Sequence, residues 1–243
     1  MRFLICWIVG VMTLVFGSAT SYADIYNEEG DLLHSADPIV VTLGCDCMIA
    51  LQLRAANLRS AAFPFDWNFS FIIDRVVELL DEDFEHYLSP NYLCLKKSEV
   101  INTRYTIEFK HDGQFFDPGS GKISNEIYDK YQRRIARFRA LKNYPGKVIF
   151  MRSAFDYHRF PFHDYGDERM GKIDAKEAEA LRDALARYFP NLNFVLVVVN
   201  YDRSLAAPIS GIDRVIEYRI SSYHKRKSYE RILTELLSPN LFP

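Results

Sequence analysis

Two cysteines in a short turn near the start of the chain are the residues best suited to chemistry. Cys45 and Cys47 follow Gly44, which ends an apolar, β-branched run over 39–43 and precedes apolar residues at helical spacing over 48–58. This pattern predicts strand, tight turn and helix. Unpaired N–H groups and the helix dipole stabilise a thiolate at the first turn of a helix. Cys47 is therefore the preferred nucleophile, and a cysteine packed in the core is the alternative interpretation.

A thiol nucleophile needs a base that takes its proton. His111 is the preferred base because it follows an alternating, half-buried strand over 105–110. His158 and His163 compete with it, since they lie in a long aromatic loop over 155–169 that could cover a site. The alternative is that His111 is only a polar loop residue.

A third group must fix the tautomer of the base. Asp112 could orient His111 only if the chain turns after the strand, because neighbouring strand residues point to opposite faces. Asp66 and Asn200 are the alternatives, and both are also candidate substrate-binding residues. Asp66 would be costly to bury without a partner, so it either bonds a catalytic group or staples its own loop.

Arginine suits an anionic substrate group because its guanidinium forms paired hydrogen bonds. Arg152 follows a second buried strand over 147–151 and is expected near the site as a substrate-binding residue. A basic run over 133–137 is more simply the solvated face of a helix. The C-x-C spacing could indicate a metal pair, but no second C-x-x-C or H-x-x-H motif is present, so neither a metal nor another cofactor is predicted.

The elements that would position these residues alternate along the chain. Further strands are predicted over 194–199 and 215–220, and helices over 48–58, 71–84, 125–142, 175–188 and 229–237, with Asp174 capping the fourth. This order predicts a three-layer α/β domain with a mostly parallel sheet flanked by helices. Ligands gather beyond the carboxyl ends of such strands, where the candidate residues would converge.

The run Leu43-Gly44-x-x-Cys47-x-x-Ala50, followed by Pro64-Phe65-Asp66-Trp67, resembles the opening of a bacterial family of unknown function labelled putative papain-like cysteine peptidase. The His111-Asp112 pair, the helix over 131–138 and the strand over 148–152 are similar to it as well. The resemblance implies peptide cleavage, with Cys47 in the position of the family's cysteine. A papain fold sets a helical lobe against an antiparallel barrel-like sheet, whereas the pattern here predicts a Rossmann-like arrangement. The label is therefore taken to describe chemistry only.

The N-terminus has the pattern of an export signal. Arg2 precedes an apolar run over 3–16, and Ser21-Tyr22-Ala23 is typical of a cleavage site. We expect a signal peptide over 1–23, an extended lead-in over 24–37 and a single α/β domain over 38–243. The protein would be secreted or periplasmic, without stable membrane association after cleavage. An uncleaved N-terminal anchor is the alternative.

Removal of the signal would delete Cys6 and leave an odd number of cysteines. A disulfide between Cys45 and Cys94 would then leave Cys47 as a thiol, which suits a nucleophile in an oxidising compartment. Three reduced cysteines are the alternative.

The formal net charge of −2 gives no reason to expect nucleic acid. The basic stretch over 224–227 is predicted to be a solvated turn, with anionic lipid or polyanion binding as the alternative. We expect a cysteine-dependent hydrolase of peptides or other small anionic or acyl substrates. A transferase or esterase acting on surface polysaccharide and a non-catalytic binding or host-interaction module are the alternatives.

The same interpretation makes a geometric prediction. If Leu43 and Phe109 end neighbouring parallel strands, the Cys47 sulfur and a His111 nitrogen should lie within about 4 Å.

Overall fold

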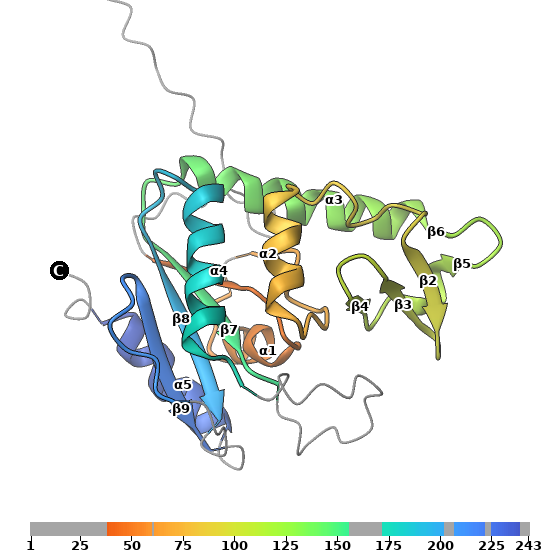
Figure 1. Cartoon of the computed structure of the whole chain (residues 1–243). Helices are drawn as coiled ribbons and strands as arrows, with labels where there is room; N and C mark the ends of the chain where they lie inside the picture. Colours follow the sequence, from red (N-terminus) through yellow and green to blue (C-terminus); the bar gives the residue numbers. More distant parts are fainter. Residues whose placement is uncertain (1–37, 60, 156–171, 202–206, 222–224, 239–243) are drawn as a thin grey trace, which may run out of the picture.

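A computed structural model describes residues 38–59, 61–155, 172–201, 207–221 and 225–238 (Figure 1). Its largest sheet has four parallel strands in the order β1-β7-β8-β9. They are β1 (Ile39–Thr42), β7 (Val148–Ser153), β8 (Phe194–Tyr201) and β9 (Val215–Ile220). All residues of β1, β7 and β8 are buried, as expected for apolar strands covered on both faces.

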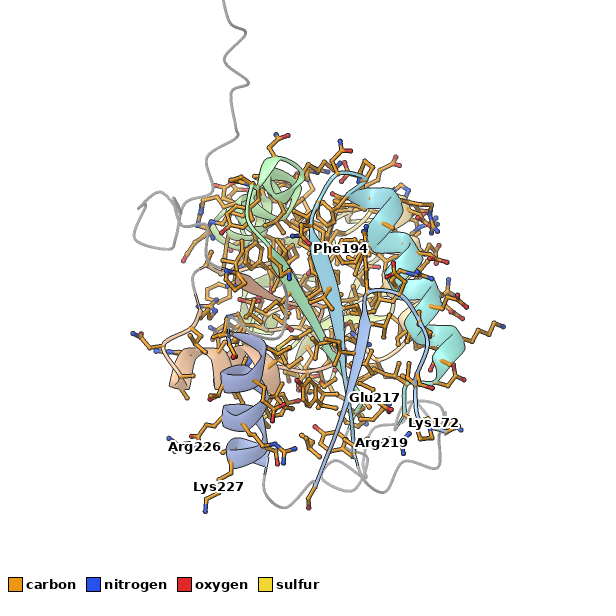
Figure 2. All side chains as sticks on the ribbon, turned by 90° about the vertical axis from the view of Figure 1, so that its left-hand side faces the viewer. Lys172, Phe194, Glu217, Arg219, Arg226 and Lys227 are labelled. Carbon is orange, nitrogen blue, oxygen red and sulfur yellow. The ribbon has the colours of Figure 1, made fainter. Side chains whose placement is uncertain are left out.

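Helices cover both faces of this sheet. Figure 2 shows α4 and α5 on opposite sides of the strands. α2 packs with α4, and α1 packs with α5. The helices are α1 (Met48–Ala55), α2 (Ile73–Asp81), α3 (Asn125–Ala140), α4 (Ala175–Tyr188) and α5 (Lys225–Leu236). The predicted three-layer α/β fold with a parallel sheet is confirmed.

A capping box begins α4. The Asp174 carboxylate accepts a hydrogen bond from the Glu177 N–H at 2.9 Å, and the Glu177 carboxylate accepts one from the Asp174 N–H at 3.1 Å. The predicted cap at Asp174 is thus confirmed.

A separate antiparallel sheet, in the order β2-β3-β4, lies away from β9 and α5 (Figure 1). It contains β2 (Leu93–Lys96), β3 (Glu99–Asn102) and β4 (Ile107–Phe109). The placement of the strand over 105–110 in the parallel sheet was therefore wrong, and Leu43 and Phe109 do not end neighbouring strands. Alternating side chains predict a half-buried strand but do not identify the strands with which it pairs.

Smaller elements complete the described chain. A hairpin joins β5 (Phe116–Asp117) to β6 (Lys122–Ile123), and short 3-10 turns span Gly113–Phe115 and Leu141–Asn143. The basic stretch predicted as a turn is helical over 225–227, the first turn of α5. None of the described helices is long and apolar enough to cross a membrane. The predicted signal peptide and lead-in, the candidates His158 and His163, and His224 lie outside the described residues.

Candidate functional site

Residues 44–47, here called the cysteine turn, join β1 to α1. The Thr42 hydroxyl accepts a hydrogen bond from the Gly44 N–H at 3.0 Å. Gly44 and Cys45 both have φ of +81°, a left-handed conformation that costs a non-glycine residue of order 1–3 kcal/mol. Cys47 is the N-cap residue of α1, as predicted, and the Asp46 carboxylate accepts from the Met48 N–H at 2.8 Å. Local backbone bonds therefore place Cys47 at the helix N-terminus.

The two cysteines of the turn differ in exposure. Cys45 is 1% exposed and packs with Phe69, Phe71 and Phe155, whereas Cys47 is half-buried against the same cluster. A nucleophile must be reached by its substrate, which favours Cys47 over Cys45.

The predicted disulfide between Cys45 and Cys94 is wrong, because the described cysteines form no disulfide with one another. Cys45 is buried in the cysteine turn, whereas Cys94 is exposed on β2 of the antiparallel sheet. An odd cysteine count shows that one thiol cannot pair within the chain, but it does not show which residues lie close together.

Arg152 lies directly beneath the cysteine turn. Its Nη1 donates to the Leu43 carbonyl at 2.7 Å and to the Ser70 hydroxyl at 2.9 Å, and its Nη2 donates to the Ser70 carbonyl. Burial lowers the pKa of Arg152, and the negative charges of Cys45, Asp46 and Glu177 oppose that effect. Both terminal nitrogens are thus bonded to the protein itself, which does not favour the predicted substrate-binding role.

Hydroxyl groups occupy the other face of the sheet at the same edge. Ser153 follows Arg152 in β7 and so points the opposite way, toward Tyr201 of β8 and Tyr229 of α5. Burial raises the pKa of Tyr229 well above its usual range, the charge of Asp46 adds to that effect, and the Tyr201 and Ser153 hydroxyls oppose it. Tyr229 is therefore neutral at physiological pH.

His111 follows β4 and is exposed. Its ring meets the Trp67 ring edge-on, with centroids 6.2 Å apart. The imidazole also lines a hollow of about 390 Å³, together with Leu95, Ser98, Lys110, Gly113 and Gln114. A substrate could therefore reach His111 from solvent.

Asp112 anchors the end of β4 to α3. Its carboxylate accepts from Lys130 Nζ at 2.7 Å and from the Tyr131 hydroxyl at 2.7 Å. Within the described part of the chain neither oxygen bonds His111, so the contacts of Asp112 hold the strand end rather than the imidazole.

Asp66 forms hydrogen bonds within its own loop. This was the structural alternative to a bond with a catalytic group. Its Oδ2 accepts from Arg59 Nε at 3.0 Å, from Arg59 Nη2 at 2.8 Å and from the Phe63 N–H at 3.2 Å. Burial raises the pKa of Asp66, and the Arg59 charge opposes that effect. The Arg59 guanidinium also lies 5.5 Å from the centre of the Trp67 ring, so this pair supports the residue that contacts His111.

Asn200 fixes the chain that leads into α4. Its Oδ1 accepts from the Ile173 N–H at 2.9 Å, and its Nδ2 donates to the Ile173 carbonyl at 2.9 Å and to Glu217 Oε1 at 2.7 Å. The residue lies at the carboxyl edge of the sheet, as predicted, but it is fully buried with these structural partners.

Residues 67–70, here called the connecting segment, join the cysteine turn to the end of β4. Phe69 exchanges two backbone hydrogen bonds with Glu108, at 3.0 and 2.9 Å. One residue later, the Ser70 N–H donates to the Cys45 carbonyl at 3.0 Å, and the Cys45 N–H donates to the Ser70 hydroxyl at 3.2 Å. Trp67, which contacts the His111 ring, and Ser70, which bonds Cys45, are three residues apart, and three residues of extended chain span at most about 10 Å. The connecting segment therefore contacts both the cysteine turn and the strand that precedes His111.

Comparison with known proteins gives a match over much of this architecture. Residues 39–204 match the family described as "Putative papain-like cysteine peptidase (DUF1796)". The chain belongs to this family. A protein of Acanthamoeba polyphaga mimivirus named "Uncharacterized protein R408" is 26% identical over 190 residues, which are 68% of this chain and 79% of that protein. No solved structure matches the chain.

For this DUF1796 protein, the match spans the cysteine turn, the connecting segment and His111. The parallel sheet flanked by helices is not the papain arrangement, so the family description does not describe this fold. Sequence reasoning missed Ser70, because its partners Cys45 and Arg152 are distant in sequence and no motif marks a serine in that role. The described residues contain no group of three or more metal-binding side chains.

Proposed function

We propose that this protein is a cysteine-dependent hydrolase with Cys47 as nucleophile and His111 as base. The main support is that one connecting segment contacts both the cysteine turn and the region of His111. The half-buried N-cap position of Cys47 favours its thiolate, and the exposed imidazole is available to exchange protons. The family description supports a peptide as the substrate.

In the proposed reaction, His111 accepts the proton of the Cys47 thiol while the sulfur attacks the carbonyl carbon of a peptide bond. The protonated imidazole then gives that proton to the leaving amine, and a thioester to Cys47 remains. Water hydrolyses the thioester, releases the carboxylic acid and restores the thiol. The two side chains must approach within about 4 Å during this sequence.

Hydrolysis of a library of quenched fluorescent peptides tests the proposal. Cys47→Ala should lower the rate to background, a loss of about 10³-fold or more, because the covalent step is removed. His111→Ala should cost about 10²–10⁴-fold. Cys94→Ala is the matched control, since Cys94 is exposed on β2 and should be dispensable.

Full hydrolysis by Cys47→Ala would exclude the proposed nucleophile. If the wild-type protein hydrolyses no peptide and Cys47 alkylates like an ordinary thiol with a pKa of about 8.5, the binding-module interpretation replaces the enzyme. The polysaccharide esterase alternative depended on Arg152 binding an anionic group, and the protein contacts of Arg152 do not favour it.

We further propose that the protein is exported. The support is the apolar segment and the A-x-A-like site at 21–23. N-terminal sequencing of protein isolated from its native host should begin at Asp24. A start at Met1 in a membrane fraction would indicate an anchor instead.

A further inference from the structure

Within the described part of the chain, Arg152 is a buried cation without an ion pair. It is 1% exposed, its terminal nitrogens bond only neutral oxygens, and Nε has no hydrogen-bond partner among the described residues. Buried guanidinium groups are normally paired with carboxylates, because an uncompensated charge is costly in a low-dielectric interior. The negative groups that act on Arg152 are Cys45, Asp46 and Glu177. Two of these three belong to the cysteine turn.

The hydrogen bonds of Arg152 lead directly to the backbone of the turn. Its Nη1 bonds the carbonyl of Leu43, the residue before the turn, and also the Ser70 hydroxyl. That hydroxyl accepts from the Cys45 N–H, while the Ser70 N–H donates to the Cys45 carbonyl. Ser70 therefore holds Cys45 in its left-handed conformation from both sides, and Arg152 holds Ser70.

The cysteine turn packs closely against Ser70 and Arg152. A Cβ on Gly44 would lie 2.3 Å from the Ser70 hydroxyl oxygen and 3.4 Å from Arg152 Nη1. The backbone of the turn therefore lies directly against the serine and the guanidinium. A charge at this distance, shielded from water, acts more strongly on neighbouring ionisable groups than a surface charge does.

We propose that Arg152 is a positioning residue of the hydrolase, which fixes the cysteine turn through Ser70 and favours a thiolate in that turn by its buried positive charge. This inference rests on the proposed function for its consequence in catalysis. It differs from a substrate-binding role, in which the guanidinium would bond the ligand, because here the arginine acts through the cysteines. A merely structural arginine would hold the backbone without changing the ionisation of a thiol.

The test is a pH titration of ultraviolet thiolate absorbance in a Cys6→Ala, Cys94→Ala background, which retains Cys45 and Cys47. In Arg152→Met, the midpoint of thiolate formation should rise by about one pH unit, because a cation next to the thiols is lost. Alkylation of Cys47 at pH 7 should slow by about tenfold. Arg152→Lys keeps the charge and should restore most of the low midpoint.

Arg182→Met is the matched control, because Arg182 is also largely buried but pairs with Asp183 and Glu179 on α4. It should leave the thiol titration unchanged. If circular dichroism shows that Arg152→Met is unfolded, Arg152→Lys and Ser70→Ala provide the test instead. Lysine should keep the midpoint near that of wild type, and Ser70→Ala should raise it because the link to Cys45 is lost.

An unchanged midpoint in a folded Arg152→Met protein overturns the inference, as does the same rise in the lysine and methionine variants. Both results leave the hydrolase proposal intact, since peptide cleavage by wild type and its loss in Cys47→Ala are measured separately. Conversely, a protein that cleaves no peptide but shows the predicted midpoints would keep the thiolate role of Arg152 and exclude the hydrolase.

Discussion

The parallel sheet and the antiparallel sheet each contribute one member of the proposed catalytic pair, but they hold it differently. β1 is buried throughout and leads into a cysteine turn fixed by Ser70 and Arg152. In the antiparallel sheet, β4 is also buried and its Ile107 and Phe109 belong to the main core, but three of the four residues of β2 are exposed. The cysteine turn thus continues from a buried strand into buried polar contacts, whereas His111 follows its strand as an exposed residue beside an exposed edge strand. Regions with fewer buried contacts open at lower free energy, so the histidine side should be the more adjustable half.

The largest expected difference between the two sheets is in stability. Phe150→Ala in β7 removes a fully buried ring that packs against Phe138, Phe189 and Phe194, and should lower the free energy of unfolding by about 3–5 kcal/mol. Leu95→Ala in β2 removes a side chain that is 42% exposed and should change it by no more than about 0.5 kcal/mol. Urea denaturation measures both. Equal costs would refute the contrast between a buried and a peripheral sheet.

The cysteine turn can be disturbed without changing a cysteine. Gly44→Ala forces a Cβ against Ser70 and should cost about 1–3 kcal/mol from overpacking, in addition to the strain of a left-handed alanine. Gly211→Ala is the control, because Gly211 has a φ of +72° but a Cβ there would meet nothing within 4 Å, so only the strain remains. Thermal unfolding and peptide hydrolysis should both decline more for Gly44→Ala. Similar losses in the two variants would mean that the close approach to Ser70 is unimportant.

The next largest expected effect concerns the attachment of β4 to α3. Asp112→Asn weakens the charged bond from Lys130 and disturbs the bond from Tyr131, which should cost about 1–3 kcal/mol. Peptide hydrolysis should decline as well, because His111 is the adjacent residue. Tyr131→Phe removes one of the same hydrogen bonds, together with the contact of that hydroxyl with Asn68 Oδ1, and should shift both measurements in the same direction. Unchanged kinetics in Asp112→Asn would show that this anchor does not place the histidine.

The smallest effect concerns pH. Hydrogen bonds from Arg104 and Tyr105 lower the pKa of Glu82 from 4.5 to about 2, and they join the end of α2 to the chain between β3 and β4. Since the folded pKa is the lower one, this stabilisation is present above pH 4.5 and is lost as the pH falls through about 2. Glu82 is partly exposed, so solvent screening limits the contribution to about 0.5 kcal/mol.

The stability difference between wild type and Glu82→Gln, measured by urea denaturation, should therefore be greatest at neutral pH and disappear at about pH 2. Glu126→Gln on α3 serves as a control for removing an exposed carboxylate. A difference that stays constant down to the lowest pH would exclude the ionised form of Glu82 as its source.

Sequence patterns predicted the parallel sheet well because β1, β7 and β8 are largely apolar runs between recognisable helices. They missed the β2–β3 hairpin, since its turn consists of Lys97 and Ser98, which have φ of +48° and +68° without the usual asparagine or glycine. Tertiary contact supports that turn: Gly113 lies so close that a Cβ there would be 1.8 Å from the Ser98 carbonyl oxygen. No local pattern contains that information.

In the candidate site, the position of Cys47 could be predicted from the sequence, but the roles of the other polar residues could not. The N-cap position of Cys47 follows from a strand, a glycine and a helix in succession, all of them local signals. The partners of Asp112, Asn200 and Arg152 lie on other elements, so their roles depend on how the layers pack. The polar residues at strand ends indicated the region in which these side chains lie. They did not indicate which side chains form hydrogen bonds to the protein itself rather than to a substrate.

The strand order also constrains how the molecule assembles. Ile39 of β1 pairs with Val148 of β7, although α1, α2, the antiparallel sheet and α3 lie between these two strands in the sequence. Closing so long a loop carries an entropic cost before the contact is rewarded, which slows folding. Ser70 can bond Cys45 early, but Arg152 arrives only with β7. During synthesis, the cysteine turn is therefore incomplete until more than half of the chain has emerged, and the Cys45 thiol is accessible to oxidants for longer than its buried final position suggests.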